Sequence, residues 1–411
     1  MYRTTPAHKV TRTLLFGAAL LLPLFAAADA SKAVASKAAP VAQAEFGPAD
    51  KLLFWTPEQQ RVGYRNMDRI GPSRPLVHAA AKARPVFPLP AAPRDLDKVT
   101  FELSGKKYTT ADYLEHNRVA GLIVIQRGRV LYEHYAFGHT AQSKWTSFSV
   151  AKSVTSMLTG AAIKDGYIRS VDDPVTDYLP ILKATSYEGV SIKNVLQMAS
   201  GVAWNEDYAD PKSDVARISA VTATGGSLAL VKYMGALPRV AKPGEKFNYN
   251  TGETHLAGAI VRAAVGNNLA TYASQKIWSQ FAMEADGYWA LTDEFGAEHG
   301  GCCMSATLRD YGRIGLLALR GGKLPNGDSL FPDSWMKDST AGSAGNPGYG
   351  YLWWLTAPGE YGARGIFGQS IQIYEAQELV IATHSLWPVA TSKEHSEYRR
   401  AFQDAMRDVL K

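Results

Sequence analysis

The order of strand-like and helix-like segments constrains the fold of this 411-residue chain more than any other feature of its sequence. Two strand-like runs, 121–126 and 129–136, stand in its first half, and two more, 370–374 and 379–385, stand near its end. Short apolar runs bounded by turn residues are typical of strands. Residues 171–265 between them are mostly helix-like and loop-like. The order predicts one sheet built from both ends of the chain, a helical second lobe, and a cleft between the two.

Helical periodicity supports this arrangement. Apolar residues recur near a 3.6-residue period over 149–165, the segment 305–320 is amphipathic, and a last helix-like segment spans about 394–410. The helical lobe is expected at about 153–298. We therefore predict an α+β fold in which helices pack beside the sheet.

The first thirty residues have the composition of an export signal. Basic residues are followed by an apolar run, 14–28, and by the small-residue motif Ala28-Asp29-Ala30. The run is too short and too rich in small residues for a stable membrane span, although an uncleaved anchor is the alternative. We expect residues 1–30 to be a signal peptide and the protein to be exported, either to the periplasm or outside the cell.

Two segments separate this signal from the main domain. Residues 31–45 are rich in Ala, Lys and Ser without apolar periodicity, which indicates a flexible linker. Residues 46–98 are rich in proline and carry scattered aromatic residues, so we expect them to wrap the surface as irregular structure without contributing to the core. The main domain is expected over 99–411.

Composition and missing motifs argue against several classes of function. The formal charge is only +6 and the basic residues are scattered, which argues against nucleic acid as a partner. The nine histidines form no H-E-x-x-H motif or other close metal pair, and the chain has no phosphate-binding glycine loop and no G-x-S-x-G elbow. We expect no metal, no cofactor, and a small molecule as the partner.

The two cysteines are adjacent, Cys302 and Cys303. A bridge between neighbouring residues is strained, since their Cα atoms lie only about 3.8 Å apart. We therefore expect two buried thiols, which behave as small apolar side chains.

The segment Ser149-Val150-Ala151-Lys152 is the first candidate for chemistry. Residues i and i+3 share one face of a helix, so Lys152 can take the proton that makes the Ser149 hydroxyl a nucleophile. Burial in this apolar helix is expected to lower the pKa of Lys152. Backbone N–H groups at the helix N-terminus would help to stabilise an oxyanion.

The Ser-x-x-Lys spacing is not specific, because Ser334 and Lys337 match it as well. Their neighbours Asp333 and Asp338 are charged, and the segment is amphipathic. We interpret it as a surface helix with Ser334 near its N-cap.

Two further elements separate Ser149 from Ser334. Tyr249 follows Ser149 by about a hundred residues, and a Tyr beside a buried Lys cation is expected to have a lowered pKa and to act as a base. The Gly365-Ile366-Phe367-Gly368-Gln369 turn precedes a strand, where glycine lets a backbone approach a ligand closely. A backbone N–H in this turn is a candidate second oxyanion donor.

Together these elements resemble the serine β-lactamase and penicillin-binding-protein superfamily, over roughly residues 100–405. Within it, SFSVAKS (147–153), EDYADPKSDV (206–215), GIFGQ (365–369) and HSLWP (384–388) are similar to the 6-aminohexanoate-dimer hydrolases, which are amidases related to class C β-lactamases. The resemblance implies a β-lactamase/transpeptidase-like fold, an antiparallel sheet flanked by helices, and an active site in the cleft.

The same resemblance implies roles for individual residues. Ser149 would be the nucleophile, Lys152 its partner and Tyr249 a second base and proton relay. The backbone N–H groups of Ser149 and Ile366 would form the oxyanion hole, and Tyr208 would lie on a loop over the substrate.

Two departures from the β-lactamase pattern concern the substrate. Ala363-Arg364-Gly365 replaces Lys-Thr-Gly, and Thr251 replaces the Asn of the usual Tyr-x-Asn motif. Both positions help to hold a substrate carboxylate in that superfamily, so we expect weak β-lactam turnover. Arg364 and Gly365 stay candidates for substrate binding.

The functional expectation is a serine hydrolase that cleaves an amide or ester through an acyl-enzyme on Ser149. A carboxylesterase, a D-Ala carboxypeptidase and a β-lactamase of the same superfamily are alternatives. A binding protein that is acylated and stays acylated, as in penicillin sensors, is the non-enzymatic alternative.

Overall fold

The computed structural model describes residues 46–78, 86–223, 225–292 and 296–411. The predicted signal peptide and the predicted linker lie outside these residues. Within the described ranges, every helix is too short or too polar to cross a membrane.

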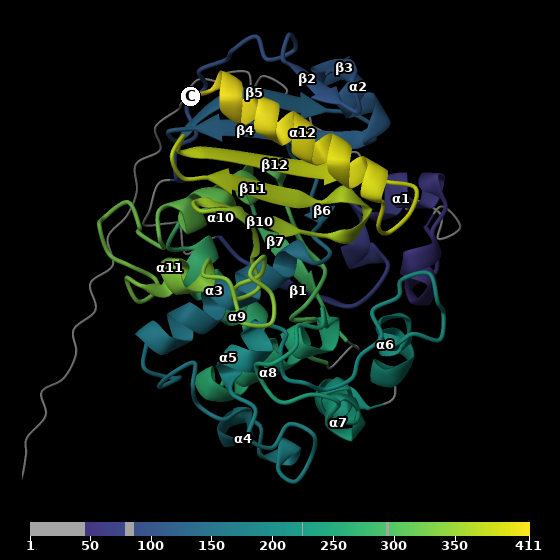
Figure 1. The fold of residues 1–411 in the computed structure, drawn as a ribbon, viewed down its shortest axis with the longest axis vertical. Helices are drawn as coiled ribbons and strands as arrows, with labels where there is room; N and C mark the ends of the chain where they lie inside the picture. Colours follow the sequence, from purple (N-terminus) through teal and green to yellow (C-terminus); the bar gives the residue numbers. More distant parts are fainter. Residues whose placement is uncertain (1–45, 79–85, 224, 293–295) are drawn as a thin grey trace, which may run out of the picture. The chain divides into compact units, whose positions relative to one another are not determined.

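A six-stranded antiparallel sheet joins the early and the late strands of the chain, as the sequence predicts (Figure 1). Strand β4 pairs with β12, from Leu379 opposite Gln126 to Ser385 opposite Val119. In spatial order the strands are β5 (Arg129–Tyr135), β4 (Val119–Gln126), β12 (Leu379–Ser385), β11 (Ser370–Tyr374), β10 (Glu360–Arg364) and β9 (Trp354–Ala357).

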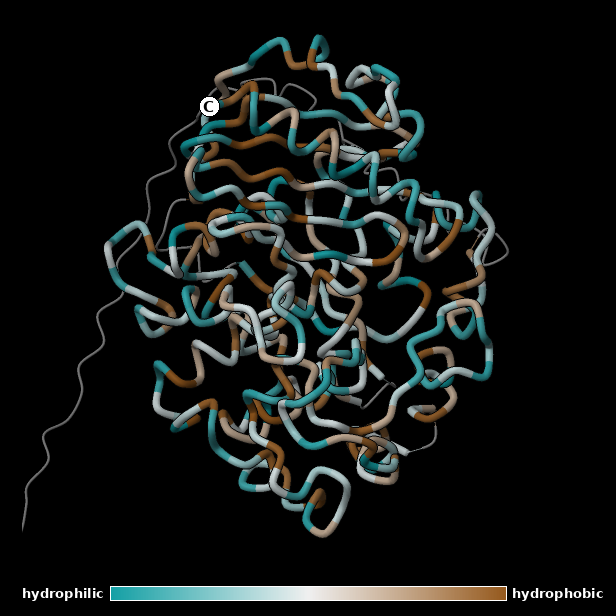
Figure 2. The backbone as a smooth tube through the Cα atoms, viewed as in Figure 1, coloured by the Kyte–Doolittle hydropathy of each residue, from teal (hydrophilic) through white to brown (hydrophobic). Residues whose placement is uncertain are grey.

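Helices cover both faces of this sheet. Helix α10 (Leu308–Leu319) packs on one face, against β4, β11 and β12. Helix α12 (Lys393–Val409) covers the other face together with α2 (Thr110–His116). Figure 2 shows the apolar colouring running along the central strands between these helices, which places one part of the core there.

The helical middle of the chain forms the second lobe, and α3 (Val150–Lys164) and α8 (Thr251–Val265) pack against each other at its centre. Almost every side chain of α3 is buried, as its apolar sequence predicts. The other helices of this region are α4 (Val175–Tyr178), η5 (Pro180–Leu182), α5 (Ile192–Leu196), α6 (Asp214–Thr222), η6 (Gly226–Leu228), α7 (Ala229–Ala236), α9 (Leu269–Ala273) and η7 (Ser274–Trp278).

A second sheet contains the strand that precedes α3 in the chain. Its strands are β1 (Ser73–Leu76), β7 (Gly287–Ala290), β8 (Met304–Ala306) and β6 (Trp145–Thr146), in that spatial order. Because β8 occupies 304–306, the predicted helix at 305–320 begins only at Leu308, after the N-cap Thr307. A small separate hairpin pairs β2 (Thr100–Leu103) with β3 (Lys106–Thr109).

The prediction for residues 46–98 was wrong in its first half. This part contains η2 (Ala49–Phe54), α1 (Pro57–Gly63), η3 (Met67–Arg69) and β1. Pro57 starts α1 instead of breaking it, since a proline at the first helical position loses no hydrogen bond, and Thr56 caps the helix. Trp55 and Tyr64 are buried in a cluster with Phe148 and Phe367, so this segment does contribute to the core.

The close approach of α10 to the sheet gives a stability prediction. A Cβ on Gly315 would lie 2.4 Å from Val380 Cγ1 and 2.8 Å from Ile371 Cγ2. Gly315→Ala should therefore lower the free energy of unfolding by about 1–3 kcal/mol through overpacking, as measured by urea denaturation. Glu115→Ala, on the exposed side of α2, should stay within about 0.5 kcal/mol of the parent. Equal midpoints for the two variants would contradict this packing.

Candidate active site

Ser149 is the N-cap residue of α3, at the position that the sequence predicts. The residue before it, Phe148, has a positive φ of 43°, which turns the chain sharply into the helix. Strand β8 fixes this turn, because Ser147 donates its amide to the Met304 carbonyl (2.7 Å) and the Met304 amide donates to Ser147 Oγ (3.0 Å). The nucleophile candidate is therefore held from the neighbouring strand and not from the helix alone.

Lys152 lies one turn along α3 and is 1% exposed. Its ammonium group donates to three oxygens: Ser149 Oγ at 3.2 Å, Thr251 Oγ1 at 2.9 Å and the Gly301 carbonyl at 2.8 Å. Burial lowers the pKa of Lys152 to about 8, as predicted, although the negative charge of Glu206 acts in the opposite direction. A lysine with this pKa is partly neutral near pH 7 and can accept a proton.

Glu206 is the residue of this network that sequence reasoning missed. Its carboxylate accepts hydrogen bonds from Thr251 Oγ1, from the Thr251 amide (3.0 Å) and from Tyr208 Oη (2.6 Å). Thr251, noted from the sequence only as a departure from a motif, links Glu206 to Lys152. Glu206 opens the EDYADPKSDV segment, from which the sequence predicted a role only for Tyr208.

The predicted lowering of the pKa of Tyr249 was wrong. Desolvation raises the pKa of this phenol, the charge of Glu206 raises it further, and hydrogen bonding to Ser149 offsets only part of the rise. The Lys152 ammonium lies 5.3 Å from the centre of the Tyr249 ring, over its face. Tyr249 is thus a neutral phenol near pH 7, which suits a proton donor and not a phenolate base.

Among the described residues, the backbone N–H groups of Ser149 and Ile366 have no hydrogen-bond acceptor. In the turn η8 (Ile366–Gly368), the neighbouring amides are engaged, with Gly365 donating to the Gln369 carbonyl and Phe367 to the Ala390 carbonyl. Ser149 and Ile366 both line the same two cavities. Paired amides of this kind are able to stabilise a developing oxyanion.

Gly365 brings this turn against residues 147–149, the nucleophile loop that leads into α3. A Cβ at this position would lie 2.6 Å from the Ser147 carbonyl oxygen, so only glycine allows the approach. The buried side chain of Gln369 then holds the turn, because its amide group donates to the carbonyls of Phe367 (3.1 Å) and Ser385 (2.9 Å). Gly365, predicted to approach a ligand, thus lies close to the backbone of Ser147, and it also lines a cavity at Ser149.

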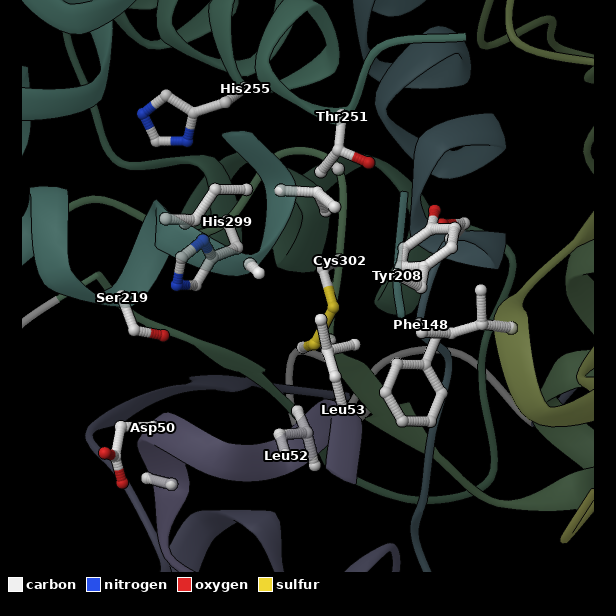
Figure 3. A pocket seen from close by; sticks show the side chains of 18 of the residues that line it. Asp50, Leu52, Leu53, Phe148, Tyr208, Ser219, Thr251, His255, His299 and Cys302 are labelled. Carbon is white, nitrogen blue, oxygen red and sulfur yellow. A yellow bond between two sulfur atoms is a disulfide. The ribbon is translucent and has the colours of Figure 1, made fainter. Parts of the chain in front are cut away.

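A cavity opens beside Ser149 and is lined largely by apolar side chains (Figure 3). Leu52, Leu53 and Phe54 contribute from the N-terminal segment, which sequence reasoning assigned to the surface. Figure 3 shows His255 and His299 together on one wall. Burial lowers the pKa of His255 to about 3 and that of His299 to about 4, so both imidazoles are neutral.

The predicted substrate-binding residues border the Ser149 region as well. Tyr208 lines the apolar cavity and a second cavity that also includes Ser149. Arg364 and Gly365 line the second cavity with Tyr249. The Arg364 guanidinium lies 5.5 Å from the centre of the Trp354 ring, and burial lowers its pKa to about 10.

The adjacent cysteines form a disulfide, which corrects the expectation of two free thiols. Their Cα atoms are 3.7 Å apart, and Cys303 adopts a positive φ of 69°. Both residues line the apolar cavity, directly after the Gly301 carbonyl that accepts a hydrogen bond from Lys152. The Cα distance alone did not exclude the bridge, because this backbone conformation brings the two sulfur atoms together.

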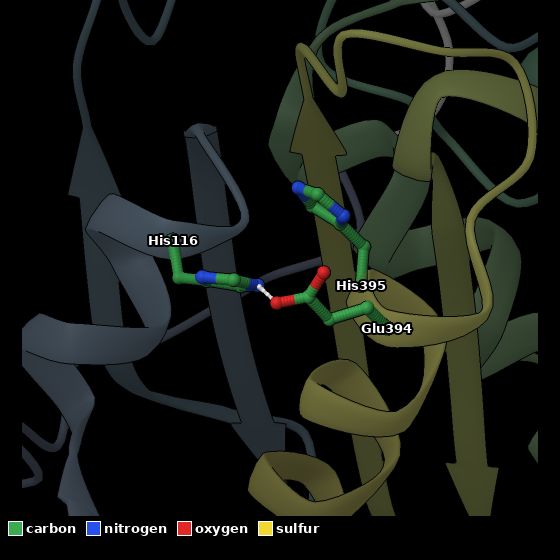
Figure 4. Close-up of side chains that lie close together, drawn as sticks. All are labelled: His116, Glu394 and His395. Atoms are coloured by element: carbon green, nitrogen blue, oxygen red, sulfur yellow. Dashed lines mark ion pairs between the residues drawn. The ribbon is translucent and has the colours of Figure 1, made fainter.

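The second Ser-x-x-Lys match lies on the surface, as predicted. Ser334 and Lys337 are exposed, at the start of α11 (Trp335–Ser339). Among the described residues, His116, Glu394 and His395 are the side chains that lie close enough together to hold a metal ion (Figure 4). Their proximity follows from packing, since the His116 ring stacks on His395 (4.8 Å) and on Tyr398 (3.8 Å).

The chain is similar in sequence to known hydrolases. The family model described as Beta-lactamase matches residues 109–405. A 6-aminohexanoate-dimer hydrolase from Paenarthrobacter ureafaciens is 29% identical over 296 residues, which cover 67% of this chain and 74% of that protein.

Solved structures share the fold. A Bacillus anthracis protein assigned as a 6-aminohexanoate-dimer hydrolase superposes with a TM-score of 0.77 at 22% identity, covering 88% of this chain and 98% of that one. A family VIII carboxylesterase gives a TM-score of 0.56 at 14% identity, covering 72% and 95%. The predicted β-lactamase/transpeptidase-like fold is confirmed.

The pKa of Lys152 gives a pH prediction. If neutral Lys152 is the base, kcat/KM should rise with pH and level off above about 8, since the lysine loses its proton there. Glu206→Gln removes the charge that raises the pKa of Lys152, so the rising limb should shift to lower pH. The measurement is a kcat/KM profile from pH 5 to 10. A limb that stays in place, or shifts upward, would exclude this coupling.

Proposed function

The chain belongs to the beta-lactamase family and is a hydrolase related to the 6-aminohexanoate-dimer hydrolases; from this premise we propose that it cleaves an amide or ester bond through an acyl-enzyme on Ser149. The observation that carries the proposal is the contact between Ser149 Oγ and the buried Lys152 amine, beside two backbone amides without acceptors. This contact joins the proposed nucleophile and base, and the residues of both proposed oxyanion donors line the cavities at Ser149, which supports the proposal.

Acylation begins at Ser149. The neutral form of Lys152 takes the Oγ proton while Oγ attacks the carbonyl carbon of the substrate, and the carbonyl oxygen becomes an oxyanion between the Ser149 and Ile366 amides. The lysine then carries the positive charge, for which Thr251 and Gly301 already supply acceptors. The site therefore needs little rearrangement to hold the charge that forms.

Collapse of the tetrahedral intermediate expels the amine or alcohol, which needs a proton. Tyr249 donates its phenolic proton and recovers one from the Lys152 ammonium, whose charge lies over the tyrosine ring. The raised pKa of Tyr249 favours this role, because the phenol holds a proton until the leaving group takes it. In the second half, water loses a proton to Lys152 and attacks the ester carbonyl. As the intermediate collapses and the acid leaves, Lys152 returns that proton to Ser149 Oγ, which regenerates the free enzyme.

The substrate is proposed to resemble that of the Paenarthrobacter relative, a short linear amide. The apolar walls of the cavity suit an aliphatic chain, and its neutral histidines supply polar contacts without charge. Tyr208 and Arg364 are proposed as further substrate contacts. Ester hydrolysis is the second candidate, since the acyl-enzyme route serves esters equally and a carboxylesterase shares the fold.

Export is also part of the proposal. Residues 1–30 carry the signal-peptide pattern described above, so we propose that the enzyme acts in the periplasm or outside the cell.

Covalent labelling tests the nucleophile. Ser149→Ala should abolish labelling by a fluorophosphonate probe, read by intact-protein mass spectrometry, because the probe attaches to the activated hydroxyl. Ser334→Ala, which removes the exposed serine of the second match, should label like the parent. Labelling that persists in Ser149→Ala would exclude Ser149 as the nucleophile.

A substrate panel tests the class of reaction. We expect repeated turnover of p-nitrophenyl butyrate and of the 6-aminohexanoate dimer, with little hydrolysis of nitrocefin and no release of D-Ala from a D-Ala-D-Ala peptide. A single stoichiometric burst without further product would instead identify an acylated sensor. Rapid nitrocefin turnover would show that Arg364 and Thr251 serve a β-lactam after all.

A further inference from the structure

The proposed oxyanion donors share an unusual backbone setting. Ser149 follows Phe148, whose φ is 43°, and Ile366 precedes Phe367, whose φ is 57°. Side chains larger than glycine rarely occupy this left-handed region, so such conformations persist only where the surroundings enforce them. The two phenylalanines therefore need support from their surroundings if both amides are to keep their direction.

Tyr64 supplies that support. Its ring packs edge-on against Phe148 (5.0 Å between centroids) and at a tilt against Phe367 (5.7 Å), while the two phenylalanine rings lie 5.3 Å apart. All three side chains are at most 1% exposed. The backbone adds a further contact, because the Thr146 amide donates to the Tyr64 carbonyl (2.9 Å) just before the nucleophile loop.

Tyr64 itself is fixed from behind. Trp55 stacks on it at 5.8 Å, and Trp145 meets its edge at 5.9 Å. The Tyr64 hydroxyl has no hydrogen-bond partner among the described residues, and Tyr64 does not line the cavities that contain Ser149. The packing contacts with Phe148 and Phe367 are made by the ring.

We propose that Tyr64 is a positioning residue that sets the direction of both oxyanion donors by clamping Phe148 and Phe367. The inference rests on the proposed function, since it takes the Ser149 and Ile366 amides as the oxyanion hole. Tyr64 lies outside residues 109–405, where the family model matches. The segment 46–78, for which the sequence suggested only a surface role, is thus a working part of the active site.

Three variants separate positioning from general stability. Tyr64→Leu removes the clamping ring, and Tyr64→Phe keeps it while deleting the unpartnered hydroxyl. Tyr113→Leu is the matched control, because Tyr113 is also fully buried with an unpartnered hydroxyl but stacks on Phe402 in a different cluster. All are compared well below their melting temperatures.

Hydrogen exchange gives a readout that does not depend on activity. In Tyr64→Leu, amides in peptides 146–152 and 364–370 should exchange about tenfold faster than in Tyr113→Leu or Tyr64→Phe, because the two turns lose their common support. Equal exchange in Tyr64→Leu and Tyr113→Leu would overturn the clamp.

Phenylboronic acid, which forms a tetrahedral adduct with an active serine, gives the functional readout. In Tyr64→Leu, the affinity for phenylboronic acid should fall about 10–100-fold. The kcat of substrate hydrolysis should fall by about the same factor, with KM nearly unchanged. Tyr64→Phe and Tyr113→Leu should stay within about twofold of the parent in both measurements. Faster exchange in the two peptides without this loss would overturn the link to the oxyanion hole. A parent enzyme that fails to label at Ser149 refutes the proposed function, while the exchange contrast still decides the clamp.

Discussion

The buried ammonium of Lys152 is the interaction around which the cleft is organised. A charge in this position requires acceptors, and the chain brings them from three places: Ser149 at the start of α3, Thr251 at the start of α8, and Gly301 before β8. An unpaired buried charge is strongly destabilising, so all three segments must supply their oxygens in the folded state. The packing of α3 on α8 and the pairing of β6 with β8 both serve that requirement.

The same environment drives the two titrating groups apart. Burial lowers the pKa of Lys152 and raises that of Tyr249, because in each case it penalises the charged form. One group becomes a neutral amine within reach of neutral pH, and the other stays a phenol. Neighbouring groups whose pKa values are separated in this way suit distinct acid and base roles.

Sequence patterns were informative where the physics is local. The period of the apolar residues located α3, and short apolar runs located β4, β5, β11 and β12 of the main sheet, but β9 and β10 were missed. The i, i+3 spacing placed Lys152 beside Ser149. They failed where the outcome depends on distant neighbours. Thr251 links Glu206 to Lys152 from another part of the chain. The direction of the Tyr249 pKa shift depends on burial that the position of a single Tyr in the sequence does not reveal. The N-terminal segment was predicted to lie on the surface because of its proline content. Proline content does not indicate whether an aromatic side chain such as Tyr64 packs against distant residues such as Phe148 and Phe367.

The pairing of β4 with β12 has a consequence for how the chain folds. About 250 residues separate these adjacent strands, so the sheet closes through contacts of very long sequence separation, which slows folding. On the ribosome, the β4–β5 hairpin is complete long before its central neighbour exists, and its unpaired edge is exposed in the meantime. A nascent chain that stops short of Leu379 lacks the middle of its own sheet, which makes it a natural client for chaperones and proteases.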